Sequence, residues 1–455
     1  MIAIYVIAIQ LISWFPVYGF YQSVVFVIPP AIGVLFLFSK HTWLSKKHLL
    51  LLMLIWSVTT LSALLNPNLL LINYGLGLLT FSSLFLILLR SGRVTQRQIN
   101  TIMLAIAWIS IFQLLVSFAQ IYVFRNTDNW FNINAYWNFM RGTLGTNSHL
   151  FSVKMFFNAM FLFFFFKSSP PISKSSQRLL LIGFVAATLG CFLASFLSGI
   201  VIMIVGCGLL YSTQRRRRIA AKKKFSKILI GGVILASVSI IIVTQGTNIR
   251  LLQNTASVVG ETMRAGPDGP ESWRFGKIFG FVTTYERLLL SSPKNLFLGT
   301  GGGHYSSRAA MILSGEYLFN QPPWMPISVT PETENFILPR VRPLRNYPAI
   351  SVMMVPFSTI QATLAETGVI GLLLFGFFWR SILRTNAALM KRESSESPLA
   401  PLREALPYLV ASLIAVYFTD LWLEFPSLSI AVFSMVSLAL SRTAIEKNLI
   451  SKSNP

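Results

Sequence analysis

The sequence predicts an all-α polytopic integral membrane protein with about twelve transmembrane helices and one large extracytoplasmic loop between helices 9 and 10. Two features of the composition predict this class: 54 % of the 455 residues are hydrophobic, and only 12 % are charged. The third observation is that the apolar residues form runs of roughly 20, the length that an α-helix needs to cross a bilayer. Because these runs recur along the whole chain, a soluble enzyme with a single membrane tail is excluded.

The candidate spans divide the chain into three regions. We place the spans near residues 2–20, 22–38, 49–65, 69–89, 99–121, 149–166, 179–196, 199–212, 228–244, 357–379, 407–423 and 427–441. The first span lacks a basic n-region and a small-residue cleavage site, so we expect a retained helix and not a signal peptide. Residues 1–244 therefore hold helices 1–9 and an outer middle loop at 122–148, residues 245–356 form the large outer loop, and residues 357–455 hold helices 10–12 and a cytoplasmic tail.

The distribution of lysine and arginine predicts the orientation. The net charge of +23 is concentrated in alternate connections, including those around Lys46, Arg93, Lys174 and Arg392. By the positive-inside rule these connections and both termini lie in the cytoplasm. The run QRRRRIAAKKKFSK is then a topology anchor that also contacts anionic membrane lipids, and we expect no nucleic-acid partner.

The large loop combines a predicted helix with glycine-rich and proline-rich segments. Apolar residues from Ser272 to Leu290 recur at spacings of three and four, which predicts a helix with one face packed on the membrane domain. Pro293 and the glycines after residue 298 should end this helix and let the backbone approach a ligand closely. The later stretch QPPWMPISVTPETENFILPRVRPLRNYPAI is too rich in proline for us to expect regular structure.

The charge of this loop favours an anionic ligand. Residues 245–356 contain ten Lys and Arg against seven Asp and Glu, a surplus of three positive charges on the outer side. Arginine presents a planar, permanently charged fork that matches phosphate oxygens, so a diphosphate is the natural target. The alternative is that single arginines are solvated or pair with the acidic residues of the same loop.

A few titratable residues outside the cytoplasmic connections are candidates for chemistry. His149 and His304 fall on the outer side, where each has a structural alternative as a hydrogen-bonding loop or helix-end residue. Glu366 begins an otherwise apolar helix and either pairs with a loop arginine or acts as a base. Three further charged residues stand in or beside spans and need a reason to be there: Lys154, Asp420 and Glu424.

Both cysteines, Cys191 and Cys207, lie in apolar runs, so we expect neither a disulfide framework nor a thiolate metal cluster.

Four local patterns occur in a recognisable order. The first pattern is in the large loop, in the stretch WRFGKIFGFVTTYERLLLSSPKNLFLGTGGGHYSS. Arg274 precedes the predicted helix, and a glycine-aromatic turn follows it, formed by Gly299, Gly301, Gly303 and Tyr305. After the loop, PFSTIQATLAETGVIGLLLF matches the pattern Leu-x-x-x-x-Glu-x-Gly-x-x-Gly-Leu well at Glu366, Gly368 and Gly371. In the middle loop, MRGTLGTNSHLFS carries Arg141, Gly145, Asn147 and His149, and the break LSGI stands at Leu197 to Ile200.

Together these patterns resemble the O-antigen ligase and Wzy-type polymerase superfamily, whose members join lipid-linked sugar chains on the outer face of the bacterial inner membrane. The chain departs from the family in two places. Phe357 stands where the family has a histidine, and the break at Leu197 to Ile200 lacks the family's arginine. The missing histidine weighs more against a ligase than against a polymerase, because ligases of the family use it for catalysis.

The resemblance implies a metal-independent inverting glycosyltransferase without a cofactor, which polymerises repeat units linked to undecaprenyl diphosphate. Arg274 would stabilise the leaving diphosphate, and Glu366 or His304 would serve as the base. The residues that would bind the diphosphate or the glycan are Arg141, Arg287, Arg345, Tyr305, Asn147 and His149. The implied partners are the lipid-linked oligosaccharide donor and acceptor, membrane lipids, a chain-length regulator and a flippase.

Two alternatives stay open. A ligase of the same superfamily would transfer finished chains to lipid A-core. A lipid-linked glycan flippase or an anion transporter, from another functional class, would place its polar residues near the bilayer midplane at broken helices.

Overall fold

The structure is a computed structural model that describes residues 2–14, 31, 34–35, 42–92, 94–123, 142–144, 148–168, 172–194, 203–208, 260, 264, 266, 276–316, 326–346, 354–392 and 397–443. Several predicted features lie outside these residues. They are Arg141, Asn147, Arg274, the helix break at Ser198 and Gly199, the span near 228–244 and nearly all of the span near 22–38.

The described part of the chain is mainly helical and contains six helical segments that are long and apolar enough to cross a membrane. Their bounds are α4 (Lys46–Leu64), the continuous series α5 (Leu71–Leu78), η1 (Leu79–Leu84) and α6 (Phe85–Leu88), then α7 (Gln96–Val123), α9 (Ser148–Lys167), α10 (Lys174–Leu193) and α19 (Thr359–Arg392). Each coincides with a predicted span. The composition and length of these helices therefore agree with a helical membrane protein. Inside a bilayer, a helix satisfies the hydrogen-bonding potential of its backbone N–H and C=O groups within its own segment.

Three shorter helices occupy the places predicted for the first, eleventh and twelfth spans. They are α1 (Ile2–Ile12), α20 (Ala400–Val416) and α21 (Pro426–Ala439). The predicted eleventh span ran to residue 423, whereas α20 ends at Val416 and a connection with a single 3₁₀ turn, η6 (Trp422–Glu424), follows. Asp420 and Glu424 therefore lie in the connection between α20 and α21 and not on a transmembrane helix.

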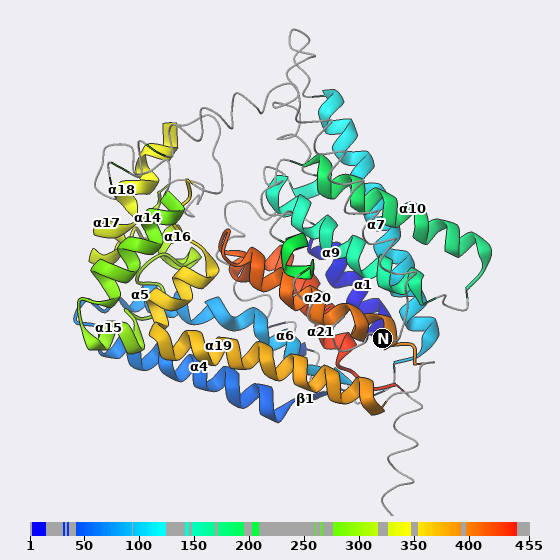
Figure 1. Ribbon diagram of the computed structural model, residues 1–455, viewed down its shortest axis with the longest axis horizontal. Helices are drawn as coiled ribbons and strands as arrows, with labels where there is room; N and C mark the ends of the chain where they lie inside the picture. Colours follow the sequence, from blue (N-terminus) through cyan, green and yellow to red (C-terminus); the bar gives the residue numbers. More distant parts are fainter. Residues whose placement is uncertain are drawn as a thin grey trace, which may run out of the picture.

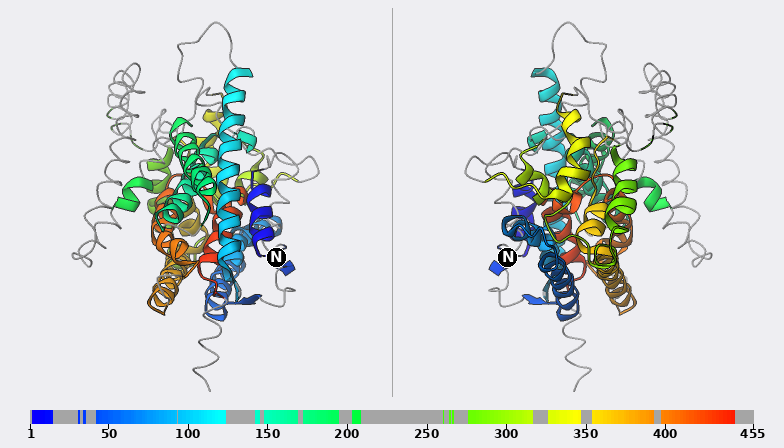
Figure 2. Two further views of the ribbon diagram at one scale, coloured as in Figure 1. Left: turned by 90° about the vertical axis from the view of Figure 1, so that its right-hand side faces the viewer. Right: turned by 90° about the vertical axis from the view of Figure 1, so that its left-hand side faces the viewer.

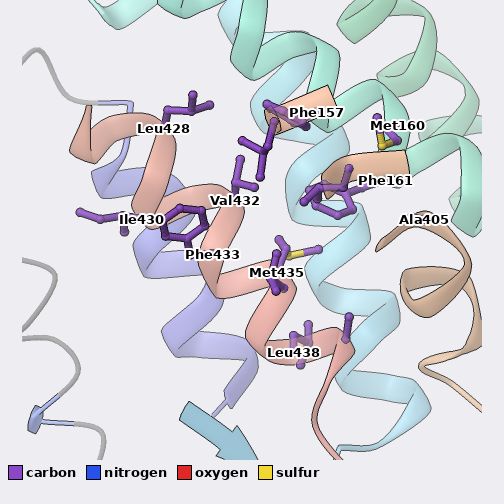
Figure 3. Packing of buried hydrophobic residues seen from close by; sticks show 14 of the residues in the cluster. Phe157, Met160, Phe161, Ala405, Leu428, Ile430, Val432, Phe433, Met435 and Leu438 are labelled. Atoms are coloured by element: carbon purple, nitrogen blue, oxygen red, sulfur yellow. The ribbon is translucent and has the colours of Figure 1, made fainter. Parts of the chain in front are cut away.

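The helices pack as two groups around α20 and α21. In Figure 1, α4 and α19 run side by side on one side, and α7, α9 and α10 form the other. The apolar core between the groups includes Phe157 and Phe161 from α9 and Val432 and Phe433 from α21, which Figure 3 shows from close by. Large apolar side chains such as Leu71, 76 % exposed, remain on the outside, as expected for helix faces in contact with lipid.

A two-stranded antiparallel sheet closes one end of α4 and α6. Strand β1 (Thr42–Leu44) precedes α4, strand β2 (Leu89–Ser91) follows α6, and Trp43 is paired with Arg90. This end carries Lys46 and Lys47, which we expect on the cytoplasmic side from the distribution of basic residues.

Short helices from the large loop gather at the opposite end of α4, α5 and α19. They are α14 (Gly276–Thr283), the π-turn η4 (Thr284–Leu289), α15 (Pro293–Leu298), α16 (Arg308–Ser314), α17 (Pro331–Phe336), α18 (Leu338–Val341) and η5 (Arg342–Asn346). Figure 1 shows them as one cluster, and Figure 2 shows that α7 runs along the opposite side of the molecule. Because its helices pack on the membrane bundle, this part of the loop is a folded cap.

Two expectations for the loop meet different outcomes. The predicted helix is confirmed over its described part, from Gly276 to Leu289. The expectation of irregular structure in the proline-rich stretch was wrong for residues 331–346, where Pro331 and Pro339 each stand in the first turn of a short helix. Residues 326–330 are irregular, as expected. In the first turn of a helix the backbone N–H has no intrahelical acceptor, so proline, which lacks this N–H, loses no hydrogen bond there. The Thr330 side chain caps α17 by accepting a hydrogen bond from the Thr333 N–H at 3.2 Å.

Candidate functional site

The glycine-rich segment 299–307, here called the glycine loop, lies between the turn that joins α4 to α5 and the outer part of α19. Gly299, Gly301 and Gly303 have positive φ angles of 77°, 100° and 76°. A Cβ added at Gly303 would lie 2.0 Å from the Asn73 carbonyl oxygen, and one added at Gly299 would lie 2.5 Å from the carbonyl carbon of Glu366. The glycines therefore bring the loop backbone close to the protein's own helices, where the sequence led us to expect a ligand.

Glu366 holds the glycine loop through backbone amides. One carboxylate oxygen, Oε2, accepts from the Gly303 N–H at 2.8 Å, and Oε1 accepts from the N–H groups of Tyr305 and Ser307 at 3.1 and 3.0 Å. The side chain is 4 % exposed, so these bonds offset the cost of burying it. The Ser307 hydroxyl also hydrogen-bonds to this carboxylate, so Glu366 positions the loop through several of its polar groups.

A break in α19 at Gly368 lets the glycine loop and α15 pack against this helix. Gly368 has φ 65° and ψ −170°, and a Cβ there would lie 2.3 Å from the carbonyl carbon of Phe297 in α15. The Thr300 N–H donates to the Ala365 carbonyl at 2.9 Å, in the turn just before the break. The glycine that follows Glu366 thus lets α15 and the glycine loop pack directly on the α19 backbone.

His304 joins the glycine loop to the turn between α4 and α5. Its Nδ1 is 2.8 Å from the Gly302 carbonyl oxygen, and its Nε2 accepts from the Leu70 N–H at 3.1 Å. This pattern requires the tautomer with the proton on Nδ1 and uses both ring nitrogens. The imidazole is fully buried, and its contacts match the structural alternative stated above.

Two asparagines on the α4–α5 hairpin fasten the same loop. Asn66 Nδ2 donates to the Thr300 carbonyl at 2.6 Å, and Asn73 Nδ2 donates to the Gly303 carbonyl at 3.0 Å. These contacts join three separate parts of the chain: the α4–α5 hairpin, the glycine loop with the end of α15, and the outer part of α19.

A second carboxylate, Glu424, holds the start of α16. Its Oε2 accepts from the Arg308 N–H at 2.6 Å. Burial raises the pKa of Glu424 from 4.5 to about 8, and the nearby charge of Glu366 adds to the shift. The Arg308 guanidinium stacks 4.2 Å from the centre of the Phe425 ring. Burial lowers the pKa of Arg308 to about 10, while Glu424 and Asp420 favour its charged form.

Lys277 and Asp420 form the other half of this buried arrangement. The Lys277 amine donates to the carbonyl of Phe357. Burial lowers the pKa of Lys277 from 10.5 to about 7, and the charge of Asp420 opposes this shift. Burial also raises the pKa of Asp420, while Lys277, the Leu421 N–H and Arg308 oppose the rise.

We call the five residues Lys277, Arg308, Glu366, Asp420 and Glu424 the outer charged cluster. Four of them are more than nine-tenths buried, Asp420 is half-buried, and neighbouring members interact electrostatically. A buried group of this composition, with an amine and a carboxyl that both titrate near neutral pH, is suited to accepting and releasing protons.

Lys277 and Arg308 were not predicted as site residues from the sequence. A signal was present for Lys277, which shares a helix face with Phe281, Thr284 and Leu288 at spacings of four, three and four. A cation on the apolar face of an amphipathic helix is expected to be buried and therefore to need a specific partner.

The remaining candidates occupy different surroundings. Tyr305 is buried, with its hydroxyl 2.8 Å from Thr284 Oγ1, and burial raises its pKa. Arg287 lies on the exposed surface of η4. Arg345 belongs to η5, and its side chain is not among those that the structure describes. His149 stands in the first turn of α9, which packs mainly on α7, α10 and α20, and so lies in another part of the bundle.

Two other loop arginines have protein partners. Arg340 Nη2 donates to Thr283 Oγ1 at 3.0 Å. Arg342 forms ion pairs with Glu334 at 2.8 Å and Glu316 at 3.1 Å on the surface. For Arg342 the pairing alternative is therefore the one observed.

Lys154, the other cation in a span, is held inside the bundle. Its Nζ donates to Ser13 Oγ at 2.8 Å and lies 4.0 Å from the centre of the Trp14 ring. The amine thus fastens α9 to the end of α1.

Comparison with protein-family models and with curated proteins finds no match for this chain. Within the described ranges, no three His, Cys, Asp or Glu side chains are grouped so that they could hold a metal ion.

Proposed function

We propose that the protein is a membrane glycosyltransferase that polymerises oligosaccharide repeat units linked to undecaprenyl diphosphate. The product is a surface polysaccharide, made on the outer face of a bacterial inner membrane, with both termini of the enzyme in the cytoplasm. One observation carries the proposal: two of the patterns behind the family resemblance are in direct contact. Gly303 of the glycine-aromatic turn donates to Glu366 of the Glu-x-Gly helix entrance at 2.8 Å, across 63 residues of sequence.

The packing of the loop supports the same reaction. A Cβ added at Gly276 would lie 2.1 Å from the Met354 carbonyl oxygen, so the start of α14 is pressed against the segment that enters α19. Arg274 precedes Gly276 by two residues in the sequence. Arg274 itself lies outside the described residues, and its entry into the site is part of this proposal.

The proposed reaction joins an acceptor sugar to the anomeric carbon of the donor glycan. The hydroxyl oxygen of the acceptor forms the new bond as the bond from the anomeric carbon to the diphosphate oxygen breaks. The electron pair of that bond leaves on the diphosphate, whose growing charge Arg274 stabilises. A well-placed donor of this kind contributes about 3 kcal/mol to the transition state, or a factor of roughly 10² to 10³ in rate.

The glycan size profile of a deletion strain tests this function. The strain is complemented with wild type, Arg274→Ala or Arg342→Ala, the last being a matched control because Arg342 already pairs with Glu334 and Glu316. We expect single repeat units in the deletion strain, full polymer with wild type and the control, and single units again with Arg274→Ala at normal protein level. Wild-type chain lengths from Arg274→Ala would refute its role.

The same experiment separates the alternatives. Full-length polymer that accumulates on undecaprenyl diphosphate in the deletion strain would identify a ligase. An unchanged surface profile would exclude both glycosyltransferases and leave the flippase or transporter.

A further inference from the structure

The small sheet at the end of α4 carries a buried arginine without a counter-ion. Arg90, in β2, is 4 % exposed, and its Nη1 donates to the carbonyls of Ile87 and Leu89. Its Nη2 is buried and has no hydrogen-bond partner. No carboxylate of the described residues forms an ion pair with Arg90, and burial lowers its pKa from 12.5 to about 9. The guanidinium therefore stays charged at neutral pH, and no protein group compensates that charge.

A second arginine and a tryptophan belong to the same sheet. The Arg442 N–H donates to the Ser91 carbonyl at 2.7 Å, and the Arg442 carbonyl accepts from the Val94 N–H at 3.2 Å. Trp43 lies opposite Arg90 in the antiparallel pair, so these two side chains share one face. The Arg442 guanidinium lies 5.6 Å from the centre of the Trp43 ring. One face of the sheet thus carries a buried cation together with an indole and an exposed cation.

The start of α4 adds two cations and leads into an apolar stripe. Lys46 and Lys47 are exposed, and within the described part of the chain neither forms an ion pair. From Lys46 the same side of α4 continues at intervals of four residues to Leu50 and Leu54, which are 62 % and 42 % exposed. Trp43 is partly exposed as well, and tryptophan rings favour the boundary between membrane and water. The cations therefore stand where a lipid-facing surface begins.

We call the face that holds these cations the basic face; it consists of Trp43, Lys46, Arg90 and Arg442. We propose that the basic face binds the phosphate of an anionic phospholipid in the adjacent leaflet. Arg442 and Lys46 contact the phosphate oxygens, while Arg90 attracts the phosphate from beneath the surface. The acyl chains lie along the apolar stripe of α4. This binding does not depend on the glycosyltransferase reaction.

The chemistry of the basic face selects this class of ligand. A phosphodiester oxygen pair matches the fork of a guanidinium, and its negative charge compensates that of Arg90. The headgroup amine of a zwitterionic lipid would instead bring another positive charge among the cations. A soluble phosphate ester would leave the apolar stripe uncovered, whereas a phospholipid occupies the stripe and the basic face together.

The test uses full-length protein in liposomes with equal amounts of phosphatidylglycerol and phosphatidylcholine that carry the same acyl chains. The photoreactive residue p-benzoylphenylalanine replaces Leu50 or, as a reference, the exposed Leu115 of α7. After illumination, mass spectrometry gives the ratio of the two lipids attached at each position. The ratio at Leu50 is then measured again in Arg442→Gln, in Lys46→Gln and in Arg178→Gln, which changes an exposed arginine at the start of α10 and is the matched control.

We expect the ratio of phosphatidylglycerol to phosphatidylcholine at Leu50 to exceed that at Leu115 by at least roughly tenfold. A cation next to the membrane surface contributes a factor of about five to the binding of an anionic lipid. Arg442→Gln and Lys46→Gln should therefore each lower the ratio at Leu50 about fivefold, whereas Arg178→Gln should leave it unchanged.

Three results would overturn the proposal. Equal ratios at Leu50 and Leu115 would mean ordinary contact with the surrounding lipid. An unchanged ratio in both Arg442→Gln and Lys46→Gln would mean that the basic face does not select the lipid. An equal fall in Arg178→Gln would assign the preference to the overall charge of the protein. Because no readout involves glycan transfer, failure of the proposed enzymatic function would not affect this test.

Discussion

Replacing Glu366 by glutamine tests whether an ionised carboxylate holds the glycine loop. Glutamine has nearly the same shape but only one acceptor oxygen. That oxygen can still accept from Tyr305 and Ser307, whereas the new amide nitrogen would face the Gly303 N–H at 2.8 Å, donor against donor. The substitution therefore removes one hydrogen bond completely and weakens two.

The magnitude follows from these three contacts. A buried N–H left without an acceptor costs about 1–3 kcal/mol. Hydrogen bonds to a charged group are roughly twice as strong as neutral ones, so each of the other two loses about 1 kcal/mol. The free energy that holds the glycine loop closed should therefore fall by about 3–5 kcal/mol.

Hydrogen exchange of the loop amides, followed by mass spectrometry in detergent micelles, measures this change. We expect amides 300–309 to exchange at least roughly 10²-fold faster in Glu366→Gln, because each 1.4 kcal/mol is about tenfold in an opening equilibrium. Glu334→Gln is the matched control, since Glu334 forms only a surface ion pair with Arg342. If the loop amides of Glu366→Gln exchange at the wild-type rate, Glu366 does not hold the loop closed. If that variant also loses glycan polymerisation at normal protein level, Glu366 acts as a base.

Two further predictions concern packing and pH. Gly77→Ala places a Cβ 2.1 Å from the Gly302 carbonyl carbon and should lower the free energy of unfolding by about 1–3 kcal/mol. Gly75→Ala, in the same helix with nothing within 4 Å, should be neutral or slightly stabilising; equal melting temperatures for the two variants would contradict this. Because the pKa of Glu424 rises from 4.5 to about 8, the folded state binds more protons in that window and its stability should fall as pH rises. Because the pKa of Lys277 falls from 10.5 to about 7, stability should rise with pH from 7 to 10.5. Melting temperatures measured across pH should show both the fall and the rise in stability. Glu424→Gln should abolish the fall and Lys277→Met the rise; a variant that keeps the pH dependence attributed to its residue would disprove that attribution.

Much of the membrane domain was predictable because its signal is local. The apolar runs of α4, α7, α9 and α10 form helices whatever their neighbours are, since a bilayer offers no other partners for the backbone. The loop helix from Gly276 to Leu289 was also visible in its apolar spacing. The helix at Pro331 was missed because proline was treated as a helix breaker, although the first turn of a helix tolerates it.

The partners of the site residues could not be predicted in the same way. Sequence marked Glu366 as an acid out of place, but it did not show that its oxygens bind the amides of Gly303, Tyr305 and Ser307. It marked His304 as a candidate base, whereas the fold engages both nitrogens of that side chain. Each of these contacts joins segments that are far apart in the chain.

The sequence by itself determined that the protein is mainly helical, where its membrane-length helices lie, and that a glycine-rich loop and an isolated glutamate stand on the predicted outer side. These properties depend on the chemistry of neighbouring residues alone. Only the tertiary structure decided that Lys277, Arg308 and Glu424 are buried near the half-buried Asp420 and that the pKa values of all four move toward neutrality. The physical reason is that burial and electrostatic coupling depend on distances between separate helices, which the packing of the whole bundle sets.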